Sequence, residues 1–410
     1  MEAKTKWRNL RFPLLALIST LILGTSLWCE ARAESILYTF MGGVDGGYPY
    51  SSLIFDGNGN LYGTTEIGGF YGKGTVFELT PNAGSWTETV LYNFGTNSAD
   101  GIYPQGSVIF DSAGNLHGTT YYGGSSTNCG FGCGTIFQIT PGSNGWTETA
   151  LYSFVGSNGQ NPRCGLVMDS KGSLYGTTEI GGSHGAGTVF QLSGSQLRVL
   201  HNFGGVNDGA NPFTGVTLDS KSNVYGTTFS GGPNGAGMVF KLSRAGDKWQ
   251  EKVLHSFTNG KGIGGYPEGG VTFDKAGDLY GTTTQLGMGT VGGVFKLRPI
   301  SGAKWSYSVL YGFTGGTDGS FPGGNVILDS ARNLYGTTQD GGVDNDGTVF
   351  KLTPTTKGPW KETLLYSFTG GSDGRHPESS GLVLDGSGNL YGTTLFGGTG
   401  EWGDIFEILH

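Results

Sequence analysis

The chain has 410 residues, of which 80 are Gly and only 14% are charged. Its 24 Phe and 19 Tyr exclude a disordered chain, because disordered segments are poor in the large apolar side chains that offset chain entropy. The formal net charge is −8, or −11 without residues 1–33, where five Lys/Arg and two Asp/Glu lie. This acidic balance argues against a nucleic-acid partner.

Residues 1–33 have the pattern of a signal peptide. An apolar run over residues 13–28 is followed by Ala31-Arg32-Ala33, an A-x-A cleavage site, and is preceded by basic residues: Lys4, Lys6, Arg8 and Arg11. We therefore expect a mature protein that is secreted or periplasmic. A retained membrane anchor is the alternative, although the run is short for a span. A lipoprotein form through Cys29 is disfavoured by the bulky Trp28 before it.

Seven repeats follow the signal peptide. A Gly-Thr-Thr motif recurs at intervals of 50 to 58 residues, at Gly63, Gly118, Gly176, Gly226, Gly281, Gly336 and Gly392. Several short strands per unit at this period are typical of a propeller blade. In the first unit the expected strands are 52–56, 60–65, 74–80 and 86–94, here called A to D. The third unit is the shortest and lacks the Trp that opens strand D elsewhere, so its outer edge should be trimmed.

The two ends of the chain predict how the ring closes. Residues 36–40, Ile-Leu-Tyr-Thr-Phe, match strand D, and the sequence stops at strand C of the seventh unit. Together they make one complete blade, which leaves no unpaired edge. The sequence therefore predicts an all-β fold: one seven-bladed β-propeller over residues 34–410, without a membrane span and monomeric.

The A to B connections each begin with Asp, as in Asp56-Gly57-Asn58-Gly59-Asn60. Asp favours the first position of a type I turn, and the following Gly accepts a left-handed backbone. We therefore interpret all seven Asp residues as turn formers, not as calcium ligands. In strand B, Gly63 marks a place that cannot hold a side chain, and we attribute this to a close approach of the neighbouring blade.

No catalytic residue, metal ligand or cofactor site is predicted. The six His residues form no HExxH or Ser/His/Asp arrangement, and His201 and His255, which stand where other blades have Tyr, are interpreted as packing residues. Glu66 and Glu179 occupy equivalent loop positions, but blades that stack ~10 Å apart place them about 17 Å apart, beyond the roughly 5–9.5 Å of glycosidase pairs. An acidic loop with Asp340, Asp344 and Asp346 could hold calcium, but we favour an ordinary turn.

Three cysteines remain in the mature chain, which is expected in an oxidising compartment. Cys129 and Cys133 lie in the B to C loop of blade two, and Cys164 begins strand A of blade three. One disulfide should form, either between Cys129 and Cys133 or from this loop to Cys164.

Aromatic side chains are unevenly distributed among the loops. The D to A and B to C loops share one end of the propeller, here called the top face. Only blades seven, one and two carry many aromatics there, and rigid aromatic surfaces suit the faces of sugars or a protein partner. The alternative is that they pack the loops themselves. The predicted ligand-binding residues are Trp402, Tyr71 and Tyr122 first, then Phe70, Tyr121 and Phe396.

The repeat also resembles a known family. The run Leu365-Tyr366-Ser367-Phe368, then Gly381 to Asp385 and Leu390-Tyr391-Gly392-Thr393-Thr394, resembles the GloVer tandem repeat of bacterial choice-of-anchor proteins. The resemblance covers residues 35–410 and implies a secreted or surface repeat protein, although we expect no C-terminal anchor here. The function that these observations favour is noncatalytic binding of an extracellular glycan or protein. An extracytoplasmic polysaccharide hydrolase or lyase, and a purely structural surface component, are the alternatives.

Overall fold

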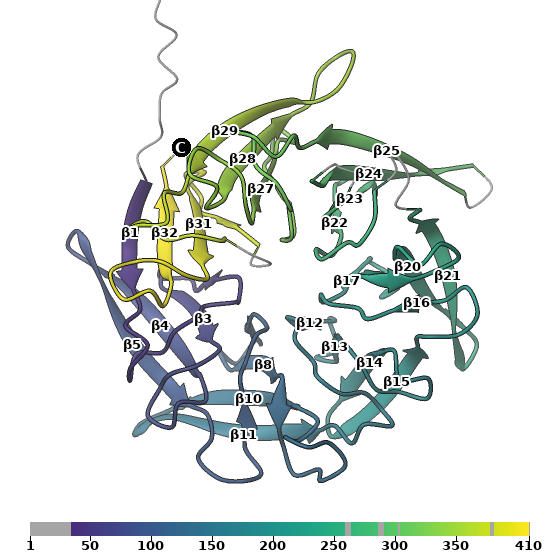
Figure 1. Cartoon of the computed structure of the whole chain (residues 1–410). Coiled ribbons are helices and arrows are strands. Elements are labelled where there is room, and N and C mark those ends of the chain that lie inside the picture. Colours follow the sequence, from purple (N-terminus) through teal and green to yellow (C-terminus); the bar gives the residue numbers. More distant parts are fainter. Residues whose placement is uncertain (1–33, 259–263, 286–290, 302–303, 378–380, 410) are drawn as a thin grey trace, which may run out of the picture. The chain divides into compact units, whose positions relative to one another are not determined.

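In a computed structural model, the described residues are 34–258, 264–285, 291–301, 304–377 and 381–409. They form strands and turns without any helix, so no described helix could cross a membrane. The signal peptide predicted over residues 1–33 lies outside the described residues. Figure 1 shows seven four-stranded antiparallel sheets arranged in a ring, with the short A strands nearest the centre.

The four strands of each blade follow the predicted order from the axis outward. The A strands are β2 Ile54–Phe55, β7 Ile109–Phe110, β12 Val167–Met168, β17 Thr217–Leu218, β22 Thr272–Phe273, β26 Ile327–Leu328 and β30 Val383–Leu384. The B strands are β3 Leu61–Thr65, β8 Leu116–Thr120, β13 Leu174–Thr178, β18 Val224–Thr228, β23 Leu279–Thr283, β27 Leu334–Thr338 and β31 Leu390–Thr394.

Longer C and D strands form the outer half. The C strands are β4 Thr75–Asn82, β10 Thr135–Gly142, β14 Thr188–Ser193, β20 Met238–Ala245, β24 Gly293–Ile300, β28 Thr348–Thr353 and β32 Asp404–Ile408. The D strands are β5 Ser85–Asn93, β11 Gly145–Ser153, β15 Gln196–Asn202, β21 Lys248–Ser256, β25 Lys304–Gly312, β29 Lys361–Ser367 and β1 Glu34–Thr39. Blade three has a six-residue C strand and a seven-residue D strand, so its predicted trimming is confirmed. Two small ribbons complete the fold: β6 Gly101–Ile102 with β9 Tyr122–Gly123, and β16 Gly209–Ala210 with β19 Ser230–Gly231.

The propeller closes through the N-terminal strand. β1 pairs with β32 from Glu34 opposite Ile408 to Thr39 opposite Asp404. The strand is thus two residues longer at its start than expected, and it ends at Thr39. Phe40 stays attached, because its N–H donates to the Gly403 carbonyl at 3.0 Å. The predicted ring closure is confirmed.

The hydrophobic core lies between the blades. At all seven interfaces, a Phe that follows strand D meets, edge to face, a Phe in strand C of the next blade, with ring centroids 5.0 to 5.4 Å apart. At the closing interface this pair is Phe40 and Phe77, at 5.3 Å, and both are fully buried. Each blade is therefore held to the next by the same aromatic contact.

The A to B turns have the structure that their Asp residues predict. The Oδ1 atom of Asp56 accepts the N–H groups of Asn58 at 2.8 Å and Asn60 at 2.9 Å, and the six later turn Asp residues also accept the N–H four residues on. Strand B then returns alongside strand A. The turn interpretation is confirmed, and these carboxylates are occupied by backbone donors.

The invariable Gly of strand B lies against a ring of its own blade. A Cβ atom on Gly118 would come within 2.5 Å of Phe137 Cζ, and the two residues are register partners of β8 and β10. The expectation that no side chain fits is confirmed, but the reason given was wrong: the crowding ring belongs to strand C of the same blade, not to the neighbouring blade.

We predict that Gly118→Ala lowers the free energy of unfolding by about 1–3 kcal/mol, because overpacking forces the Phe137 ring away from its partner Phe94. Gly57→Ala is the matched control, since a Cβ there would meet nothing within 4 Å, and its effect should stay within about 0.5 kcal/mol. Urea unfolding measures both. Equal stabilities of the two variants would contradict the packing explanation.

Candidate functional site

A groove of about 860 Å³ lies between the top-face loops of blades one and two. Tyr71 and Lys73 line it from blade one, and Phe131 lines it from blade two. Tyr71 is 47% exposed, Phe131 is 73% exposed and Phe70, which meets the Tyr71 ring edge to face at 5.0 Å, is 74% exposed. Exposed aromatics beside a groove are typical of interaction surfaces, so this groove is the candidate site.

The polar groups of the groove come from short side chains and from two charged residues, Lys73 and Asp100. Asn97, Ser98, Ser125, Ser126 and Thr127 line it together with several glycines. The Lys73 ammonium donates to the Tyr103 hydroxyl at 2.8 Å, so its position beside Tyr71 is fixed. The surface thus combines aromatic planes with short hydrogen-bonding groups.

A disulfide between Cys129 and Cys133 stiffens the loop that carries Phe131. The prediction of one disulfide is confirmed, and of the two pairings considered it is Cys129 with Cys133 that forms. Cys164 is a free, buried cysteine, and burial raises the pKa of its thiol. The Asn128 side chain donates to the Val155 carbonyl at 3.0 Å, and the Gly123 N–H to the Phe131 carbonyl at 2.8 Å. The loop is therefore fixed at several points while Phe131 faces solvent.

Tyr121 and Tyr122 lie next to this groove but are not among the residues that line it. Their rings meet at 4.6 Å, and Tyr122 also contacts Phe131 at 5.7 Å. The Tyr121 hydroxyl points the other way and donates to Glu179 of blade three at 3.1 Å. Both tyrosines are partly buried and neither lines the groove, so they support the residues that form it.

Trp402 and Phe396 form a separate group at the junction of blades seven and one. Both rings meet Tyr48, at 5.0 Å and 5.2 Å, and the Trp402 indole covers Gly42 so closely that a Cβ there would lie 2.3 Å from it. Both side chains are partly buried. The structure thus brings the predicted residues together in two groups, and the contacts of this second group are those of loop packing.

A second cavity, of about 710 Å³, occupies the propeller axis. Its lining includes the residues that directly follow the Pro in five of the D to A loops: Tyr50, Gln105, Arg163, Phe213 and Glu268. The Arg163 guanidinium lies 5.0 Å from the Phe213 ring and 6.0 Å from the Tyr50 ring. Sequence reasoning missed these residues, although a variable residue after a repeated Pro was a visible signal.

Glu66 and Glu179 each have their own partners beside this cavity. Glu66 accepts the Gln105 amide at 2.8 Å, whereas Glu179 lies 3.9 Å from Arg163 and accepts Tyr121. Asp340 pairs with His376 at 3.0 Å, and within the described residues its loop does not gather three ligand atoms. Each of these acids therefore has a partner of its own among the described residues.

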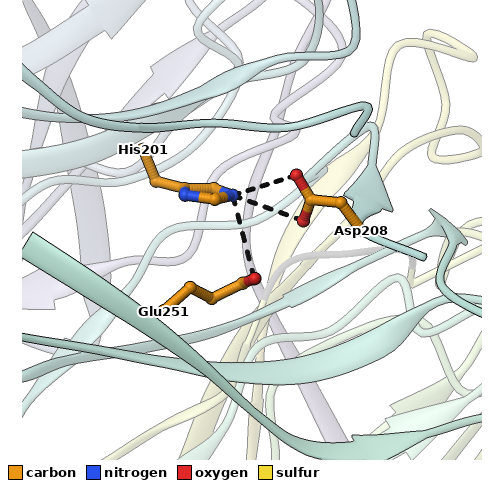
Figure 2. Close-up of side chains that lie close together, drawn as sticks. All are labelled: His201, Asp208 and Glu251. Atoms are coloured by element: carbon orange, nitrogen blue, oxygen red, sulfur yellow. Dashed lines mark hydrogen bonds and ion pairs between the residues drawn. The ribbon is translucent and has the colours of Figure 1, made fainter. Parts of the chain in front are cut away.

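Sequence reasoning also missed a cluster at the interface of blades three and four. His201 in β15 was interpreted as a packing residue, but its ring meets Asp208 from the loop before β16 and Glu251 in β21 (Figure 2). The replacement of a repeated Tyr by His was the only sign of it in the sequence.

The fold and the repeated interfaces define a tandem-repeat β-propeller of seven blades. Over residues 26–228 and 191–406 the sequence matches the family model described as the Gloeobacter/Verrucomicrobia repeat. The chain belongs to this family, so the resemblance inferred from its motifs is confirmed. No curated protein sequence matches it.

Solved structures share the fold at low sequence identity. The extracellular domain of a protein described as a hybrid two-component system from B. thetaiotaomicron superposes with a TM-score of 0.55 and 11% identity, over 91% of this chain and 39% of that one. A protein described as a 6-phosphogluconolactonase from Bacteroides uniformis gives a TM-score of 0.49 and 13% identity, over 77% and 84%. This chain spans about two-fifths of the first structure's length, and the similarity concerns the fold alone.

Proposed function

We propose that the protein is a noncatalytic extracytoplasmic propeller that binds a glycan in the groove between blades one and two. The observation that carries this proposal is the group of exposed aromatics Phe70, Tyr71 and Phe131 beside a groove of short polar side chains. Aromatic planes present rigid apolar surface to a sugar ring at little entropic cost, and the amide and hydroxyl groups suit its hydroxyls.

Two further features support binding outside the cytoplasm. Residues 1–33 have the pattern of a signal peptide, and disulfides such as Cys129–Cys133 persist in oxidising compartments. The bridge also holds the Phe131 loop in one shape, which lowers the ordering cost of binding. Tyr121 and Tyr122 brace this loop, while Trp402 and Phe396 support the neighbouring sector.

The test is binding of the mature chain, residues 34–410, to a panel of bacterial and plant polysaccharides. In the variant Phe70→Ala, Tyr71→Ala, Phe131→Ala we expect affinity to fall at least about 30-fold, because truncating a central aromatic anchor typically costs 2 kcal/mol or more. The thermal midpoint should not change, since the three side chains are exposed. Trp402 is left intact because its replacement would disturb Gly42 and Tyr48.

The matched control replaces exposed apolar residues in other top-face loops, Val206→Ala with Val343→Ala, whose side chains are 96% and 72% exposed. It should bind as tightly as the parent chain. If the triple aromatic variant binds as tightly as the parent chain, the groove is not the binding site. Release of reducing ends from a bound polysaccharide would instead support the hydrolase alternative.

A further inference from the structure

One inter-blade contact is repeated around the propeller. At four interfaces a Tyr in strand D donates its hydroxyl to an Asp in the following loop, at 3.0 to 3.2 Å. A half-buried Glu from strand D of the next blade faces the same Asp. The four sets are Tyr38, Asp45 and Glu88; Tyr92, Asp100 and Glu148; Tyr311, Asp318 and Glu362; and Tyr366, Asp373 and Glu34.

At the interface of blades three and four, His201 takes the place of the Tyr. Its Nε2 atom lies 3.1 and 3.3 Å from the two carboxylate oxygens of Asp208, and 3.8 Å from Glu251 Oε1. The imidazole thus faces two carboxylates at once, as Figure 2 shows, with the three side chains converging from three segments. A neutral phenol hydroxyl donates to an Asp, whereas an imidazole nitrogen can ligate a metal.

One carboxylate oxygen of this cluster has no hydrogen-bond donor. Glu251 Oε1 is buried and accepts no hydrogen bond, since 3.8 Å to His201 Nε2 is too long for one. The Asp208 carboxylate accepts hydrogen bonds from the Gly209 N–H at 2.7 Å and the Gly205 N–H at 3.4 Å, which fix its position. The equivalent Glu residues of the four Tyr-Asp interfaces also have an unpartnered Oε1, so the feature that sets this interface apart is the imidazole beside two carboxylates. A cation among the three groups would satisfy the buried Glu251 oxygen, which is costly to leave without a donor.

We propose that His201, Asp208 and Glu251 bind one divalent transition-metal ion, with Zn²⁺ as the reference, at the interface of blades three and four. One ligand atom from each residue lies within 4.8 Å of the others. Tetrahedral zinc with bonds of ~2.0–2.1 Å separates its ligand atoms by about 3.4 Å, so small side-chain movements suffice. The three side chains are 12 to 21% exposed, which leaves the ion a path from solvent.

The ligand set also selects the class of metal. Imidazole nitrogen with two carboxylates suits Zn²⁺ and its transition-metal neighbours, whereas Ca²⁺ and Mg²⁺ prefer all-oxygen sites with more ligands. Because the ligands come from two adjacent blades, the ion would join blade three, whose C and D strands have six and seven residues, to blade four, whose C and D strands have eight and nine. The site thus acts as a cross-link where the sheet edge is trimmed.

The test titrates ZnCl₂ into the chelator-treated mature chain by calorimetry and counts bound metal by elemental analysis. We expect one tightly bound Zn²⁺ per chain and a raised thermal midpoint. His201→Tyr restores the side chain that five of the other six blades carry, so it should fold normally while its zinc affinity falls at least about 100-fold, more than the 10–100-fold carried by outer-shell partners. Glu251→Gln should weaken binding in the same direction and change the visible spectrum of bound Co²⁺.

His117→Tyr is the matched control. His117 also stands at a position where the other blades carry Tyr, and its Nε2 lies 3.1 Å from Asp111. Among the described residues, no second carboxylate completes a metal cluster with this pair. This variant should bind Zn²⁺ as the parent does. Unchanged zinc binding in His201→Tyr, or an equal thermal response to CaCl₂, would overturn the proposal.

Discussion

Deletion of residues 34–40 is expected to unfold the propeller or to lower its thermal midpoint severely. The deletion removes β1, which is the outer strand of blade seven. The backbone N–H and C=O groups of β32 that pair with β1 then lose their hydrogen-bond partners. It also removes Phe40, which is fully buried against Phe77. The closing interface then lacks the aromatic pair that holds the other six interfaces together. Circular dichroism during heating compares the chains that begin at residues 34 and 41.

A point variant separates strand loss from core loss. Phe40→Ala should cost about 3–5 kcal/mol, as is usual for a buried Phe, while the exposed Phe70→Ala should cost less than about 0.5 kcal/mol. Unfolding in guanidinium chloride gives both values. A deletion mutant with the parent's midpoint would mean that the ring does not depend on its N-terminal strand.

The second large effect is a loss of stability as the pH rises from about 4.5 to 8, the range set by the pKa values of four half-buried Glu residues. At the four interfaces that pair a strand-D Tyr with an Asp, burial and then the facing Asp carboxylate raise the pKa of Glu34, Glu88, Glu148 and Glu362 to about 7 from 4.5. Between these two pKa values the folded chain holds protons that the unfolded chain has released. The free energy of unfolding therefore falls with rising pH and levels off above pH 7 to 8.

Other groups do not reverse this trend. The turn Asp residues have lowered pKa values, so they are ionised in both states throughout this range. Burial lowers the pKa of His255 to about 4, which gives the opposite slope below pH 6.5, but this is one group against four.

Glu→Gln variants provide the control for the pH effect. Gln imitates the protonated Glu, so Glu88→Gln should flatten the pH dependence and Glu88→Gln with Glu148→Gln should flatten it further. Thermal midpoints across the pH series measure this. A stability that stays level or increases over the same range would contradict the assignment of raised pKa values to these residues.

The fold was predictable because its determinants are local and repeated. The Gly-Thr-Thr period gave the blade count, the Asp turns fixed the A to B hairpins, and the matching ends of the chain gave the closure. Strands of the first unit were placed within two residues of β2 to β5, because apolar alternation and turn residues bound each strand. The strand pattern did not reveal which ring covers Gly118, and for this reason the crowding there was attributed to the wrong blade.

The site was less predictable because its contacts cross from one repeat to another. That Trp402 covers Gly42 depends on how the N-terminal segment runs beneath the last loop. The approach of His201 to Glu251 depends on the stacking of two blades, so neither residue alone signals a cluster. The sequence also did not indicate which loop aromatics are exposed. Tyr71 and Tyr122 are both loop aromatics, but Tyr71 lines the groove whereas Tyr122 packs against Phe131.

The central claim, that the top face binds a glycan between blades one and two, is tested most directly by a crystal structure of the mature chain with an oligosaccharide from a polysaccharide that it binds. The account predicts sugar density in the groove, with rings against Tyr71 and Phe131. Density in the axial mouth beside Arg163, with the groove empty, would contradict it.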